Sequence, residues 1–130
     1  LYWKGDVEDN VFALFKNKKG QVASLHSTMT QWRHIFSLEI FLEQGYIVLN
    51  GLKTSSNSYG EEKLTLAINR TKAPSATWTD EEEHTFSVDD SWERELSIFR
   101  DAILEDRPIE ICGIEDALRL MEMVDEVYAQ

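Results

Sequence analysis

The sequence predicts an α+β fold: an open, mostly antiparallel sheet with two C-terminal helices packed on one of its faces. Up to residue 88, the apolar residues follow strand patterns separated by short polar loops of hairpin size. From residue 89, the apolar spacing changes to the three-to-four-residue period of amphipathic helices. Strands that come first and helices that come last are typical of this fold class.

Two strands are expected first, over residues 7–16 and 21–30. The polar loop Asn17-Lys18-Lys19-Gly20 joins them as a hairpin. The centre of the first strand, residues 11–15, is apolar at every position. A strand with one solvent-facing side should alternate between apolar and polar residues, so this run indicates a strand covered on both faces.

Four further strand segments follow, over residues 35–43, 46–49, 62–69 and 84–88. Gln44-Gly45 is expected to reverse the chain between the first two of these, and residues 46–49 are again apolar on both faces. Two helices can cover only one side of the sheet. We therefore expect the second face to meet another domain or a second subunit, so that the protein forms homo-oligomers through the open sheet face.

The last third of the chain predicts two helices with acidic outer faces. Asp89 or Asp90 is suited to cap the first helix, and Gly113 precedes the second. Each helix carries one apolar stripe, formed by Trp92, Leu96, Phe99 and Ile103 in the first and by Ile114, Leu118, Met121 and Val124 or Tyr128 in the second.

Composition and charge narrow the possible functions. The 130 residues fit a single domain (residues 1–130) with a real core, and the net charge is −11. Residues 80–130 hold 17 Asp/Glu and 4 Lys/Arg, whereas residues 1–79 hold 7 and 9. Such an acidic surface repels phosphate backbones, so nucleic acid is not expected as a partner. No apolar run is long enough to cross a bilayer, so no membrane partner is expected either.

The single cysteine, Cys112, cannot form an intramolecular disulfide, which fits a reducing, cytoplasmic location. The chain begins at Leu1 without a methionine, inside a patterned segment, so we expect it to be part of a longer protein.

An ordered series of segments resembles the C-terminal domain of the glucose–fructose oxidoreductase/inositol dehydrogenase (Gfo/Idh/MocA) family. The resemblance extends over nearly the whole chain. It is carried by residues 7–12, 20–23, 30–40, 44–46 and 58–62 and by the final helical pair, from Trp92 through Glu115-Asp116-Ala117-Leu118 to Tyr128.

The resemblance implies an NAD(P)-dependent parent oxidoreductase that acts on a sugar, nucleotide sugar or polyol. In that family an N-terminal Rossmann domain binds NAD or NADP, and the C-terminal domain completes the substrate pocket and builds oligomers. This chain has no Gly-x-Gly-x-x-Gly turn and no Glu-Lys-Pro motif. We therefore expect no catalytic, cofactor-binding or metal-binding residue in it, no cofactor bound by it, and no hydride transfer by it alone.

Four residues are candidates for substrate binding. Trp32, Arg33 and His34 lie at a strand junction: the indole could stack on a sugar, the guanidinium could clamp an anion or hydroxyl, and the imidazole could hydrogen-bond a hydroxyl. Alternatively, Trp32 belongs to the core and Arg33 pairs with an acidic neighbour such as Glu39. Tyr59, in the polar loop 51–60, could line the pocket or simply anchor its loop.

A different class of protein remains open. The chain could be a stand-alone α+β dimerisation or interaction module without enzymatic activity. His26, His34 and His84 show no zinc-ligand spacing, and the sequence contains no recognisable nucleophilic triad.

Overall fold

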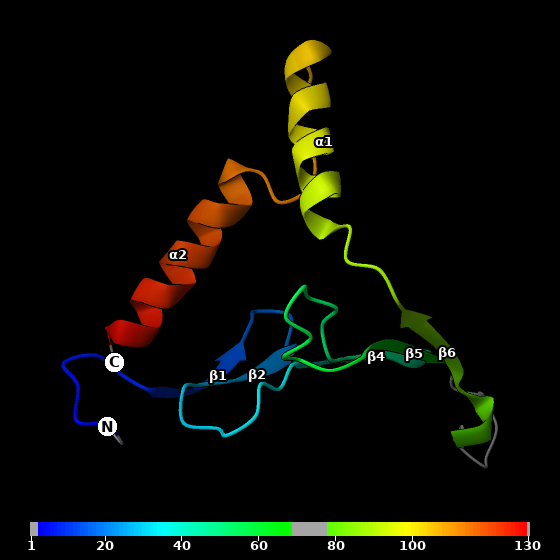
Figure 1. Cartoon of the computed structure of the whole chain (residues 1–130). Helices are drawn as coiled ribbons and strands as arrows, with labels where there is room; N and C mark the ends of the chain where they lie inside the picture. Colours follow the sequence, from blue (N-terminus) through cyan, green and yellow to red (C-terminus); the bar gives the residue numbers. More distant parts are fainter. Residues whose placement is uncertain (1–2, 69–77, 130) are drawn as a thin grey trace. The chain divides into compact units, whose positions relative to one another are not determined.

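The computed structural model describes residues 3–68 and 78–129 (Figure 1). The chain divides into two compact units. One comprises residues 1–31 and 93–130, and the other comprises residues 32–92.

The first unit begins with a hairpin of β1 (Asn10–Lys16) and β2 (Val22–Thr28), which pair antiparallel along their full length. The turn matches the expected loop chemistry: Asn17 Oδ1 accepts hydrogen bonds from the backbone N–H groups of Lys19 and Gln21, at 2.9 and 3.1 Å. Gly20 has a φ of 84°, a conformation that glycine adopts at no steric cost.

The β1–β2 hairpin is not buried on both sides as its apolar centre led us to expect. Phe12 and Leu14 are 75% and 82% exposed. Phe12 stacks on His26 directly across the ladder, with ring centroids 4.1 Å apart and planes inclined by 12°. A two-stranded ladder can shield little of either face, and cover for Phe12 and Leu14 from another domain or subunit stays a prediction.

The second unit is built on an antiparallel meander in the order β3-β4-β5-β6. Its strands are β3 (Ser37–Leu42), β4 (Gly45–Asn50), β5 (Glu62–Ile68) and β6 (Glu82–Phe86), preceded by a short 3-10 helix over Trp78–Asp80. Buried residues concentrate on the middle strands: Thr65 and Ala67 are 8% and 5% exposed, and Gly45 is buried opposite Ile68.

The register gives the meander one strongly apolar face. Leu38, Leu49 and Leu64 lie in one cross-strand row, and Ile40, Ile47 and Leu66 lie in the next apolar row. Side chains alternate between the two sides of a strand, so these rows share a face. We call this set the aliphatic face of the meander: Leu38, Ile40, Leu42, Ile47, Leu49, Leu64, Leu66 and Ile68.

Two helices end the chain, α1 (Ser91–Leu104) and α2 (Ile114–Tyr128), drawn as the coiled ribbons of Figure 1. Both begin within two residues of where the sequence predicts them. Their apolar stripes are exposed: Trp92, Phe99 and Leu118 are 73%, 55% and 54% accessible. The packing of the helices on a sheet face therefore stays a prediction.

The α+β class, the open antiparallel strands and the two C-terminal helices are confirmed. The prediction that all strands belong to one sheet is wrong for the described residues, whose strands form two separate sheets. Side-chain hydrogen bonds between Asn10 Nδ2 and Thr30 Oγ1 (3.1 Å) and between Thr28 and Thr30 (3.0 Å) close the hairpin there, and its pairing does not continue into β3.

The last strand also lies earlier than predicted, over Glu82–Phe86 rather than residues 84–88. Its two glutamates pair with Leu66 and Thr65 of β5. An edge strand tolerates such charges because its side chains reach water, which the alternation of apolar residues alone does not reveal.

Candidate substrate-binding site

Two of the four predicted site residues meet in the structure. The ring centroids of His34 and Tyr59 lie 5.1 Å apart, with planes inclined by 48°. His34 precedes β3, and Tyr59 lies near the end of the loop between β4 and β5, so the two rings come from separate segments of the same unit. The geometry is that of a tilted aromatic pair and leaves the polar edge of each ring able to hydrogen-bond.

The other two predicted residues, Trp32 and Arg33, directly precede His34 in the sequence, but the ring contact joins only His34 and Tyr59. Trp32 is fully exposed, so the alternative that it belongs to the core is wrong for this chain. Arg33 is exposed as well, and within the described part of the chain it forms no ion pair with Glu39. The structure therefore brings His34 and Tyr59 together and leaves Trp32 and Arg33 as exposed neighbours.

The loop over residues 51–61 holds Tyr59 in place. Gly51 is buried, donates its N–H to the Phe36 carbonyl oxygen at 3.0 Å, and has a φ of 70°. A Cβ at this position would overlap the Glu61 carbonyl oxygen, so both the conformation and the space require glycine. The backbone N–H of Lys53 donates to Glu62 Oε2 at 2.7 Å and fixes the next part of the loop.

Polar contacts connect this loop to the chain entering α1. Lys53 Nζ donates to Asn57 Oδ1 at 2.8 Å. Asp89 accepts hydrogen bonds from the hydroxyl and backbone N–H of Ser91, at 2.7 and 3.3 Å. These bonds, together with a backbone bond from Ser55 and the charge of Lys53, lower the pKa of Asp89. Asp89 thus contacts both the loop and the first turn of the helix.

A hollow of about 380 Å³ opens beside this loop. It is lined by Lys53, Asn57, Gly60, Glu61, Thr85, Phe86 and Ser87. Glu62 pairs with Phe86 and Ser37 pairs with Asn50, so the hollow, His34 and Tyr59 all belong to the same end of the meander. We call this the loop end of the sheet. Sequence reasoning missed the lining residues, because β6 and the loop are brought together only by strand pairing.

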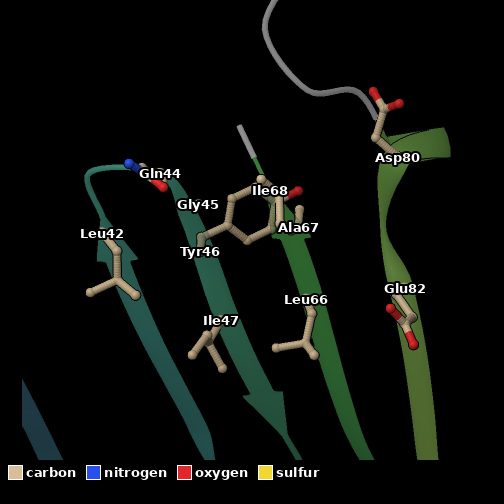
Figure 2. Close-up of a pocket in the computed structure, with 10 residues that line it drawn as sticks. All are labelled: Leu42, Gln44, Gly45, Tyr46, Ile47, Leu66, Ala67, Ile68, Asp80 and Glu82. Atoms are coloured by element: carbon tan, nitrogen blue, oxygen red, sulfur yellow. The ribbon is translucent and has the colours of Figure 1, made fainter. Parts of the chain in front are cut away.

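A second hollow, of about 530 Å³, lies at the opposite end of the same strands (Figure 2). Leu42, Ile47 and Leu66 come from three neighbouring strands, and Asp80 and Glu82 come from the β6 side. We assign this hollow no ligand.

Tyr46 also lines this second hollow and carries a perturbed ionisation. Its hydroxyl donates to Glu81 Oε1 at 2.6 Å. That hydrogen bond, with partial desolvation and the negative charges of Glu81 and Asp80, raises the pKa of Tyr46 above its ordinary value. The neutral phenol is therefore the form that this site stabilises.

Within residues 3–68 and 78–129, no group of three or more His, Cys, Asp or Glu side chains is placed to hold a metal ion. None of the helices in the described ranges has the length and apolarity needed to cross a bilayer.

Comparisons of the chain with protein-family models, with curated proteins and with solved structures found no match.

Proposed function

We propose that the chain is the C-terminal substrate-binding and oligomerisation domain of an NAD(P)-dependent oxidoreductase acting on a sugar, nucleotide sugar or polyol in the cytoplasm. The observation that supports this most is the meeting of His34 and Tyr59 at the loop end of an open antiparallel meander. Loops at one end of a rigid sheet are a common place for ligand-binding residues. The sequence resemblance supplies the reaction class.

The side chains at the loop end of the sheet suit a hydroxyl-rich ligand. An imidazole and a phenol can each donate or accept a hydrogen bond, and each ring offers an apolar surface. The exposed guanidinium of Arg33 adds several donors in a fixed plane. In this proposal these groups orient the substrate, while NAD or NADP and the hydride-transfer residues belong to an N-terminal Rossmann domain.

The oligomerisation role rests on the aliphatic face of the meander. Within it, Leu42 and Ile68 are 58% and 80% exposed, although both are large apolar residues. Large contiguous apolar surfaces on soluble domains commonly mark interaction sites. A second copy of the chain is the partner we propose for this face.

The coding sequence upstream of Leu1 tests the proposal. We expect it to encode, in the same reading frame, a Gly-x-Gly-x-x-Gly turn between a strand and a helix and a Glu-Lys-Pro motif further on. A start codon a few residues before Leu1 would contradict the proposal.

A second candidate function is a stand-alone module that self-associates and performs no chemistry. The exposure of both the aliphatic face and the helix stripes favours it, because self-association alone would account for those surfaces. The two candidates differ at the loop end of the sheet, which only the first requires to bind a small molecule.

A further inference from the structure

The hollow at the loop end of the sheet has a lining of mixed chemistry. Lys53 contributes an ammonium donor, Thr85 and Ser87 contribute hydroxyls, and Glu61 contributes a carboxylate acceptor. Asn57 contributes an amide, whose oxygen already accepts from Lys53 Nζ at 2.8 Å. The residues that line the hollow therefore carry both donors and acceptors.

Phe86 gives this lining an apolar surface. It ends β6, pairs with Glu62, lines the hollow and is 44% exposed. An aromatic ring beside convergent polar groups is the arrangement that binds the C–H face of a sugar or cyclic polyol, because such a ligand is apolar on its face and polar around its edge.

The charge around Lys53 argues against a phosphorylated ligand. The ammonium lies within the electrostatic influence of Asp89, and the carboxylate of Glu61 lines the same hollow. The carboxylate of Glu62 is also close, since it accepts the backbone N–H of Lys53 at 2.7 Å. Among the lining residues Lys53 is the one cation and Glu61 the one carboxylate, and Glu62 and Asp89 place two further carboxylates near Lys53. This charge balance disfavours a phosphate, whereas a neutral hydroxyl can accept from Lys53 and donate to Glu61.

We propose that this hollow is a subsite for a neutral polyhydroxylated ligand, with Lys53 and Phe86 as its specificity-determining residues, and that it disfavours phosphorylated sugars and nucleotide sugars. The inference rests on the proposed function and narrows its substrate class. The volume of about 380 Å³ lies within the range of about 300–1,000 Å³ found for small-molecule sites.

The test is a nuclear magnetic resonance titration of the isotopically labelled chain. The neutral probes are myo-inositol, methyl glucoside and sorbitol, and myo-inositol 1-phosphate is the charged match of the first. We expect saturable shifts of the backbone amides of residues 53–61 and 85–87 with at least one neutral probe. The phosphorylated probe, myo-inositol 1-phosphate, should bind at least roughly tenfold more weakly than that neutral probe.

Substitutions of the lining residues test whether the probe binds in this hollow. Lys53→Met should weaken the neutral probe roughly tenfold, as expected for loss of a charged hydrogen bond, and Phe86→Ala should weaken it several-fold. Lys18→Met, in the hairpin turn of the other unit, is the matched control and should leave the affinity unchanged. Glu61→Gln should selectively improve binding of the phosphorylated probe.

No saturable shift with any neutral probe, tighter binding of the phosphorylated one, or equal effects of Lys53→Met and Lys18→Met would each overturn the subsite. These outcomes are separable from failure of the proposed function. An upstream Rossmann domain with no binding here would reject only the subsite, and binding here without an upstream Rossmann domain would reject only the oxidoreductase.

Discussion

The hydroxyl of Tyr46 donates a hydrogen bond to Glu81 Oε1 at 2.6 Å and so joins β4 to the segment between the 3-10 helix and β6. Thirty-five positions separate the two residues in the sequence. Strand propensity does not predict this bond. Because the bond forms only when the two segments are folded together, the pKa of Tyr46 reports whether this part of the sheet is folded.

This bond predicts a specific alkaline titration. The pKa of Tyr46 is raised from 10.0, chiefly by the bond to Glu81, so the stability that it contributes is complete below about pH 10 and is lost as the pH rises through the folded-state value. Tyrosine ionisation followed by phenolate absorbance should show a component that titrates above pH 10 and belongs to Tyr46. This component should be absent in Tyr46→Phe and should titrate at lower pH in Glu81→Gln. A component that titrates at or below pH 10 and disappears in Tyr46→Phe would contradict the assignment.

The lowered pKa of Asp89 predicts a loss of stability in acid rather than in alkali. Its pKa is lowered from 3.8, first by the hydrogen bond from the Ser91 hydroxyl, so its contribution is present above about pH 3.8 and is lost as the pH falls through the folded-state value. Amide hydrogen exchange in the first turn of α1 should accelerate in Asp89→Ala at neutral pH. Asp106→Ala, beyond the end of the helix, is the control and should leave that turn unchanged.

Gly51 should be intolerant of substitution. Gly51→Ala places a side chain at a φ of 70° and against the Glu61 carbonyl oxygen, and we expect a loss of about 1–3 kcal/mol in the free energy of unfolding. Gly20→Ala is matched in conformation, with a φ of 84°, but has open space around it, so it should cost less. Denaturant unfolding compares the two variants, and equal losses would show that the contact with Glu61 contributes nothing.

The aliphatic face predicts concentration-dependent self-association. Ile40→Glu places a charge in that face and should raise the dimer dissociation constant roughly tenfold or more, because a charge buried without a partner is costly. Phe41→Glu, on the adjacent residue and the opposite face, is the control. Sedimentation at high micromolar concentration measures both, and a wild-type chain that remains monomeric there would contradict this role for the face.

Much of the secondary structure could be predicted from local pattern, because each element carries its own signal. The chain reverses between β3 and β4 one residue earlier than predicted, over Glu43 and Gln44, and Gly45 is the first residue of β4. The stripe from Trp92 to Ile103 defines α1 for the same reason. Local pattern could not supply the division of the strands into two sheets, because the pattern of each segment does not say which strands pair.

The candidate site was predictable in part. His34 and Tyr59 stand out in the sequence as a strand-junction histidine and a loop tyrosine, and the structure places their rings 5.1 Å apart. Lys53 and Phe86 carry no comparable signal. They line one hollow only because β5 and β6 pair and bring the end of β6 to the loop.

The measurement that tests the central claim most directly is the reduction of NAD or NADP by the full-length product of the gene that encodes this chain, in the presence of sugars and polyols. We predict reduced nicotinamide to accumulate with at least one of these substrates. Tyr59→Phe should raise KM several-fold with a smaller change in kcat, because Tyr59 orients the substrate and does not react. A full-length product that reduces neither nucleotide with any member of the panel would contradict the account.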